Sequence, residues 1–277
     1  MLAFIHIHKA AGTTVHHILR SSFGFRHCDV RPWNSPPPGL EQWQVPFTAE
    51  DLQRLYVIYP NLRSIASHSV HPYSDLDSAR PDIIYFTLMR DPLKMGASLY
   101  QYVVENNDRR GLTFESWIAK ETTRNRQTKI IAGRDDVNAA IQVISEKNVF
   151  VGLSERFDES MLLLKSFLAP DVNIGYERKN VAHRNVLAEQ ILTCDDTRQM
   201  LIEANQADIE LYKFVCREIY PVYQQEYGKH LERDVANYKC SRGGFNKRNE
   251  VFAYLKHHAL YRSFRFLYQM STQTRLR

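Results

Sequence analysis

The first residues whose types and spacing can do chemistry form a loop near the amino terminus. The loop reads His8-Lys9-Ala10-Ala11-Gly12-Thr13-Thr14. It stands between an apolar stretch typical of a buried strand, residues 2–8, and a helical pattern over residues 13–22. Backbone N–H groups at a helix N-terminus, together with a lysine and two hydroxyls, form a site for a phosphate-like anion. The spacing is not that of a Walker A loop.

A second candidate anion site follows the strongest predicted strand. Arg90 comes directly after the β-branched and aromatic run of residues 83–89, and Ser98 lies two turns into the helix that Pro92 begins. If both side chains face one crevice, the arginine fork and the serine hydroxyl can bind a second phosphate. The alternative is a surface ion pair between Arg90 and Asp91, with Ser98 as an ordinary helix residue.

Two histidines between these elements are candidates for a general base. His68 and His71 come just after another predicted strand, residues 62–67. An imidazole with a pKa near 6.5 can accept a hydroxyl proton close to neutral pH. No cluster of residues at metal-ligand spacing is present, so the sequence predicts no metal site.

Taken in order, these motifs resemble the PAPS-dependent sulfotransferases (PAPS is 3′-phosphoadenosine 5′-phosphosulfate). The resemblance is to the carbohydrate group, which includes the heparan sulfate 6-O- and 2-O-sulfotransferases and their bacterial relatives, and it spans residues 3 to about 228. Residues 6–14 resemble that family's 5′-phosphosulfate loop, and Arg90-Asp-Pro with Ser98 resembles its 3′-phosphate element. Further similar stretches are Asn125 to Lys129, Val151 to Ser160, and Asn205 with Asp208, Leu211 and Tyr212.

The resemblance implies a transfer of a sulfuryl group from PAPS to a hydroxyl, expected to be that of a glycan, with PAP as the other product and no metal. It implies that His68 is the base, with His71 as the fallback, and that Lys9 stabilises the departing phosphate. The residues that it implies for PAPS are Lys9, Ala11, Gly12, Thr13, Thr14, Arg90 and Ser98. The residues Asn125, Arg126 and Gln127 either line the acceptor groove with His71 or brace a helix.

The chain departs from the family pattern in its loop, where His8 replaces the usual proline and Ala10 the usual threonine. Because of these departures, a second function remains an alternative, that of a non-catalytic nucleotide-binding protein of the same fold. A P-loop kinase-like phosphotransferase is a further alternative, disfavoured because no Walker Ser/Thr follows a lysine to hold Mg²⁺. The first strand begins at residue 3, without the membrane anchor of eukaryotic members, which favours a bacterial-type, soluble, cytoplasmic enzyme or a shortened chain.

The elements that must position these residues alternate between strands and helices. Predicted strands cover residues 2–8, 62–67, 83–89 and 149–153, and predicted helices cover residues 13–22, 92–106, 114–121, 137–146, 158–168 and 195–220. The alternation predicts an α/β fold, a P-loop-like central parallel sheet with helices on both faces, followed by a C-terminal helical extension. We expect a sulfotransferase domain over residues 1–230 and an extension over residues 231–277.

Loops of variable sequence are expected to build the acceptor pocket. They are the proline-rich excursion of residues 29–49 and the segments 106–124 and 170–185. The last of these contains Asn180, His183 and Arg184, which form either a solvated charged loop or a cover for the nucleotide.

Composition and charge exclude several other classes of protein. Of the 277 residues, 44% are hydrophobic and 24% charged, which is globular usage, and no apolar run or leader indicates a membrane span or secretion. The four cysteines lie far apart, which favours free thiols in a reducing cytosol over two disulfides.

The positive charge is concentrated at the C-terminus. Residues 229–277 hold 11 Lys and Arg against 3 Asp and Glu, whereas the first 228 residues hold 25 against 28. A nucleic-acid binder would carry basic stripes throughout, so nucleic acid is not an expected partner. The extension interleaves its basic residues with aromatic ones, which fits a membrane-surface contact, an anionic polysaccharide groove, self-association or a plain packed helix.

Overall fold

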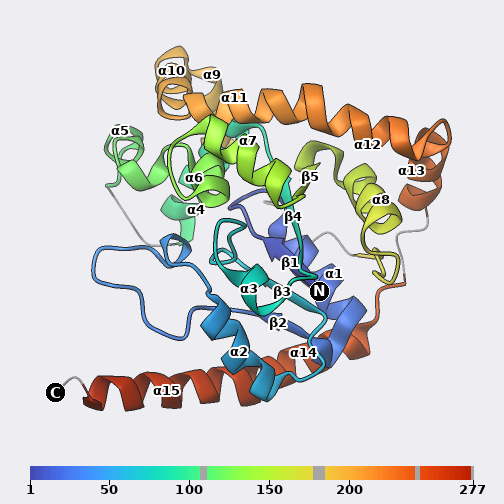
Figure 1. The fold of residues 1–277 in the computed structure, drawn as a ribbon. Coiled ribbons are helices and arrows are strands. Elements are labelled where there is room, and N and C mark those ends of the chain that lie inside the picture. Colours follow the sequence, from blue (N-terminus) through green and yellow to red (C-terminus); the bar gives the residue numbers. More distant parts are fainter. Residues whose placement is uncertain (107–110, 177–184, 241–243, 276–277) are drawn as a thin grey trace.

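The computed structural model describes residues 1–106, 111–176, 185–240 and 244–275 and has an α/β architecture, as the sequence predicts (Figure 1). Its sheet has five parallel strands in the order β2-β3-β1-β4-β5. The strands are β1 (Leu2–Ile5), β2 (His27–Asp29), β3 (Ser64–Ser67), β4 (Ile84–Met89) and β5 (Phe150–Leu153). Every residue of β1, β3 and β5 is buried, which explains why these strands read as continuous apolar or small-residue runs.

Helices cover both faces of this sheet, because parallel crossovers are right-handed. The connection from β1 to β2 and the connection from β3 to β4 run in opposite directions along the sheet, so they cross opposite faces. The helices of the first part of the chain are α1 (Gly12–Phe23), α2 (Ala49–Ile58), α3 (Leu76–Ala79), α4 (Pro92–Asn106), α5 (Phe114–Ile118), α6 (Arg126–Ala132) and α7 (Val137–Glu146).

The second half of the described chain is helical. Its helices are α8 (Phe157–Phe167), α9 (Val186–Thr193), α10 (Asp195–Ala204), α11 (Gln206–Phe214), α12 (Tyr220–Tyr227), α13 (Leu231–Cys240), α14 (Lys247–Lys256) and α15 (Arg262–Arg275). Single π-helical segments, Val215–Ile219 and His257–Tyr261, join α11 to α12 and α14 to α15. None of the helices in the described ranges combines the length and the apolar run that crossing a membrane requires.

Two expectations about secondary structure were wrong. The single helix expected over residues 195–220 is interrupted at Asn205, whose backbone leaves the helical region and whose side-chain amide donates to the Leu201 carbonyl at 2.9 Å. The strand β2 was not expected, because two of its three residues, His27 and Asp29, are polar.

The C-terminal extension is helical, as expected, and it packs on the α/β core. Helix α14 lies along α1, where Asn249 donates to the Ser21 carbonyl at 2.9 Å and Phe252 stacks on Phe25 (Figure 1). Farther on, the hydroxyl of Tyr261 donates to the Arg31 carbonyl at 2.7 Å and its side chain is almost fully buried. This packing matches the plainest of the four roles that the sequence left open for the extension.

The described thiols carry no disulfide. Cys28, Cys194 and Cys216 are free, in agreement with the expectation of free thiols for these three. The side chain of Cys240 lies outside the described part of the structure.

Candidate active site

The loop that follows β1 has a backbone shaped by two residues in the left-handed region. Lys9 has φ 59° and Ala11 has φ 60°, a conformation that non-glycine residues adopt at a cost of about 1–3 kcal/mol and that concentrates at functional sites. Helix α1 begins directly after Ala11, and its first turn contains no acidic residue. The N-terminal amides and partial positive charge of α1 are therefore available to an anion.

Gly12 allows this loop to pass close to His6, the residue that follows β1. A Cβ atom at Gly12 would lie 1.9 Å from the Nε2 atom of His6, so no other residue type fits there without moving His6. Thr14 is buried in the first turn of α1, whereas Thr13 is exposed. Of the two threonine hydroxyls that the sequence offers, Thr13 therefore stands on the solvent side of the loop.

Two cations meet at this loop. Arg90, at the end of β4, donates from Nη1 to the carbonyl oxygen of Lys9 at 2.8 Å, and the Nζ atom of Lys9 lies 4.6 Å from the ring centre of Tyr102. Among the described residues, no carboxylate forms an ion pair with either side chain. Burial, and then the charge of Arg90, lower the pKa of Lys9. The charge of Glu105 acts on Lys9, and the charges of Glu155 and Asp91 act on Arg90, in the opposite direction. An anion bound here would add to that partial compensation.

Ser98 lies on the same helix face as Tyr102, one turn earlier in α4. Residues four apart on a helix are neighbours, so Ser98 stands on the side of α4 that Lys9 contacts. The Asp91 side chain accepts from the amides of Leu93 and Lys94 at 3.0 Å each and thereby caps α4. Asp91 is therefore a helix cap, which leaves Arg90 free for the loop.

His68 stands after β3, in the middle of a stack of three imidazole rings. The ring centre of His68 is 3.8 Å from that of His6 and 3.7 Å from that of His8. Its Nδ1 atom is 2.6 Å from the His6 carbonyl oxygen, which can only accept, so Nδ1 carries the proton. The lone pair of neutral His68 is therefore on Nε2, which has no hydrogen-bond partner among the described residues.

Burial keeps the ring of His68 uncharged. Burial lowers the pKa of His68 to about 3, although the hydrogen bond to His6 opposes that shift. Burial also lowers the pKa of His6 and His8 well below the ordinary value. The sequence gives His6 no role of its own and shows His8 only in place of the family's usual proline, yet their rings sandwich the candidate base.

His71 is enclosed in the protein interior. Its Nδ1 atom is 3.0 Å from the Ile130 carbonyl oxygen, its Nε2 atom is 2.8 Å from the Trp43 carbonyl oxygen, and its side chain has no exposed surface. Burial lowers its pKa to about 4. The neutral ring donates to only one of these carbonyls, and its lone pair faces the other one in the interior. His71 therefore presents no lone pair to a substrate, and the geometry favours His68.

Arg126 is buried beside the histidine stack. Its Nη2 atom donates to the Glu41 carboxylate at 3.1 Å, and its guanidinium lies 4.7 Å from the ring centre of Trp43, which in turn contacts His8 edge-on. The Nε atom of Arg126 and the Nδ1 atom of His8 are buried without a hydrogen-bond partner in the described structure. Both Glu41 and Trp43 belong to the proline-rich excursion, so this segment does reach the candidate base.

Gln127 and Asn125 act as braces in this structure. The amide of Gln127 accepts from the Arg90 backbone N–H at 3.0 Å and donates to the Arg90 carbonyl at 2.8 Å. The Oδ1 atom of Asn125 accepts from the Asp208 backbone, and the Asp208 carboxylate accepts from the amides of Gln127 and Thr128. Asp208 thereby caps α6, and burial raises its pKa to about 6.

Asn180, His183 and Arg184 lie outside the described residues. Of the remaining predicted site residues, Lys9, Arg90 and His68 follow the carboxyl ends of the neighbouring strands β1, β4 and β3, the edge where ligands of parallel sheets bind.

A scan against protein-family models finds none that matches this chain, and a search of curated proteins finds no match either. The function of the site is therefore inferred from its geometry.

Proposed function

We propose that this protein is a sulfotransferase that moves a sulfuryl group from PAPS to a hydroxyl of a carbohydrate. The observation that carries the proposal is the tautomer of His68. Its Nδ1–H is fixed by the His6 carbonyl, so Nε2 offers a lone pair, and the cationic loop of Lys9 and Arg90 follows the neighbouring strands. A base near a cationic loop is the pairing that sulfuryl transfer to an alcohol requires.

The residues have distinct roles in this proposal. His68 accepts the acceptor's hydroxyl proton at Nε2 while the acceptor oxygen forms a bond to sulfur. The bond that breaks joins sulfur to the 5′-phosphate, and PAP leaves. Lys9 and the amides at the start of α1 stabilise the negative charge that grows on the departing phosphate. Arg90 and Ser98 bind the 3′-phosphate, and Arg126 orients the acceptor beside the base.

The proposal also covers the setting of the reaction. We propose a cytoplasmic enzyme that needs no metal for the transfer step, with a glycan as its macromolecular partner. Lys9 and Arg90 form no ion pair with a described carboxylate, which supports an anionic donor, whereas the acceptor is inferred from the family resemblance.

The first test measures donor binding and transfer separately. We expect the purified full-length chain to bind PAPS in calorimetry and to transfer labelled sulfate to at least one member of a panel of glycans and small alcohols, with EDTA present. PAPS binding without transfer to any acceptor would favour the non-catalytic nucleotide-binding alternative. Activity that EDTA abolishes, with ATP as the donor, would favour the phosphotransferase.

The matched variants are Lys9→Ala and Lys94→Ala. Lys94 is an exposed lysine of α4, so its loss tests for a general effect of charge. Loss of one donor to a transition-state charge typically costs about 10²–10³ in kcat, so we expect that loss for Lys9→Ala and none for Lys94→Ala. Equal activities in the two variants would refute the role of the loop.

A further inference from the structure

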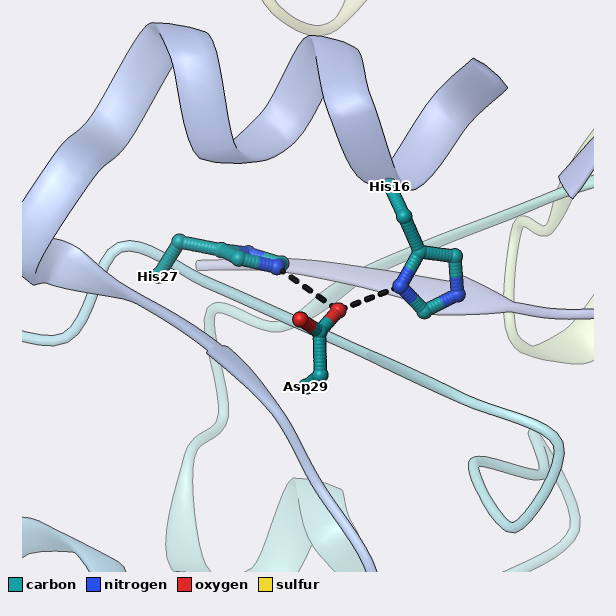
Figure 2. Close-up of side chains that lie close together, drawn as sticks. All are labelled: His16, His27 and Asp29. Carbon is teal, nitrogen blue, oxygen red and sulfur yellow. Dashed lines mark hydrogen bonds and ion pairs between the residues drawn. The ribbon is translucent and has the colours of Figure 1, made fainter. Parts of the chain in front are cut away.

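Three metal-binding side chains converge beneath the candidate active site. They are His16 of α1 and His27 and Asp29 of β2, and one ligand atom from each lies within 4.8 Å of the others (Figure 2). The Nε2 atom of His27 is 3.1 Å from Oδ1 of Asp29, and Nδ1 of His16 pairs with the same oxygen. Two imidazoles and one carboxylate oxygen therefore point at one place from two different elements.

Each of these side chains has a second partner that fixes its orientation. The other nitrogen of His27, Nδ1, is 2.8 Å from the hydroxyl of Ser64, and the other nitrogen of His16, Nε2, is 3.0 Å from Nδ1 of His6. Both of those partners can accept a proton donor. A histidine that binds a metal with one nitrogen needs such an acceptor for the N–H of the other.

The carboxylate is held in the same way. Arg20 binds the second oxygen of Asp29 through Nε at 2.7 Å and Nη2 at 2.6 Å, which leaves Oδ1 for the two histidines. His27 is 1% exposed, whereas His16 and Asp29 are 12% and 20% exposed. The cluster therefore reaches solvent on the side of His16 and Asp29, where an ion can enter and a water can complete its coordination.

We propose that Nδ1 of His16, Nε2 of His27 and Oδ1 of Asp29 bind a divalent transition-metal ion of the Zn²⁺ class. Two nitrogens and one oxygen suit such ions, which accept three protein ligands and an exchangeable water. In the bound form each imidazole carries its single proton on the nitrogen that faces Ser64 or His6. Because Arg20 offsets part of the carboxylate charge, we expect weaker binding than at a site without that cation.

This ion would support the active-site loop without taking part in transfer. His16 holds His6, and the ring of His6 lies against Gly12 and stacks on His68. The site was not visible in the sequence because its ligands come from a helix and an unpredicted strand, with spacings of 11 and 2 residues. The proposal stands independently of the sulfotransferase activity, since binding is measured directly.

The test uses the chelator-treated full-length chain titrated with Zn²⁺ in calorimetry and with Co²⁺ in visible absorption. We expect one equivalent of metal to bind and Co²⁺ to develop the ligand-field band of a low-coordinate nitrogen and oxygen site. His16→Ala and Asp29→Asn should abolish that band, and Ser64→Ala should weaken affinity by about 10- to 100-fold because it removes an outer partner.

The control is His17→Ala, the next residue of α1, whose ring pairs with Glu250 outside the cluster. It should bind metal as the wild type does. Circular dichroism of every variant separates lost binding from lost folding, and Ser64→Ala keeps the test informative if the ligand variants misfold. No stoichiometric binding by the wild type, or equal affinity in the wild type, His16→Ala and Ser64→Ala, would overturn the proposal.

Discussion

Arg90 shows how one side chain can serve both the loop and a ligand. One of its guanidinium nitrogens donates to the Lys9 carbonyl, and no described carboxylate forms an ion pair with the guanidinium, although the charges of Glu155 and Asp91 act on it from farther away. Burial lowers its pKa, which indicates that a bound anion would relieve the cost of holding this charge away from water. The neighbouring Ser98 supplies a hydroxyl on the same side of α4.

We expect Arg90→Ala and Ser98→Ala to weaken binding of PAPS while leaving binding of adenosine 5′-phosphosulfate, which lacks the 3′-phosphate, close to that of the wild type. A lost charge-assisted contact of about 1.5–3 kcal/mol corresponds to roughly a 10- to 150-fold loss for Arg90→Ala. Calorimetry with both nucleotides measures the difference, and Ser145→Ala on the exposed side of α7 is the control for Ser98→Ala. Equal losses for both nucleotides would mean that the residues only stabilise the fold.

His68 must be neutral to accept a proton. Because burial lowers its pKa to about 3, it is neutral above that value, and the base is lost only as the pH falls through it. We therefore expect kcat/KM for PAPS to stay constant as the pH is lowered from 6.5 toward the pKa of His68. This parameter reports the protonation state of the protein before PAPS binds. An acid limb centred near 6.5 would contradict the enclosed state of His68.

His68→Ala should retain PAPS affinity and lose about 10²- to 10⁴-fold in kcat. Added imidazole should restore part of the rate, an effect that a purely structural role would not produce. His71→Ala should keep more of kcat, because His71 is fully buried and both of its nitrogens face backbone carbonyls, away from a substrate. The reverse ranking would move the base to His71.

At the scale of elements, the short helix α6 links the two halves of the site. Its first residues carry Arg126 toward the histidines and Gln127 toward Arg90, and its N-terminus is capped by Asp208 of α11. The interruption at Asn205 starts the new helix that carries Asp208. The predicted long helix is thus divided at Asn205 into α10, which packs on α5 and α9, and α11, which packs on α6 and α7.

Gln127→Ala should weaken the attachment of α6 to the backbone of Arg90. It leaves the N–H and carbonyl of Arg90 without their partners, which typically costs about 1–3 kcal/mol, and it frees Arg90 to move relative to the loop. We expect a higher KM for PAPS and a lower urea midpoint, whereas Gln142→Ala on the exposed face of α7 should change neither. An unchanged KM with a lowered midpoint would limit Gln127 to a role in stability.

For the whole molecule, the C-terminal helices complete the packing of α1. Glu250 pairs with His17, and the backbone N–H of Asn246 donates to the Ser21 hydroxyl oxygen at 2.6 Å. The hydroxyl of Tyr261 donates to the Arg31 carbonyl, just after β2. A chain that ends at residue 243 should therefore show a strongly lowered Tm or fail to fold. A chain that ends at residue 269 should keep the wild-type Tm, and a wild-type Tm in the shorter chain would show that the extension is dispensable.

Buried histidines also make the stability of the whole molecule depend on pH. His68 and His71, with pKa values of about 3 and about 4, stay neutral in the fold while an unfolded chain protonates them near 6.5. The unfolded state thus binds more protons between those values, so stability falls as the pH drops below 6.5. Asp208, with a pKa of about 6 against 3.8, acts in the opposite sense and stabilises the fold as the pH falls toward 4.

These two histidines alone outweigh the carboxyl group by on the order of 2 kcal/mol between pH 7 and pH 5. His6, His8 and His257, whose pKa values burial also lowers, act in the same direction, so we expect a net loss of at least that size. Urea unfolding at both values measures it. His71→Gln should have a smaller pH dependence than the wild type, because it removes one of the groups that titrate only after unfolding. A stability that rises steadily from pH 7 to pH 5 would contradict the neutral state of these rings.

The α/β class and the central parallel sheet could be predicted from the sequence alone. The apolar runs of residues 83–89 and 149–153 predict buried strands, and the helical periods between them predict a parallel sheet with crossovers, as the structure has it. Local signals were also sufficient for the start of α4, because Asp91 and Pro92 are strong helix-initiating residues. The strand β2 was not predicted, because three residues of mostly polar character are too few to show a strand period.

The contacts between side chains of different elements could not be predicted from the sequence and are known only from the tertiary structure. The choice between His68 and His71 depends on backbone carbonyls of Trp43, Ile130 and His6, and these lie far away in the sequence. The stack around His68 and the cluster of His16, His27 and Asp29 likewise join separate elements. A sequence pattern records the burial and period of each segment, whereas contacts between segments depend on strand order and side-chain packing, which no local pattern contains.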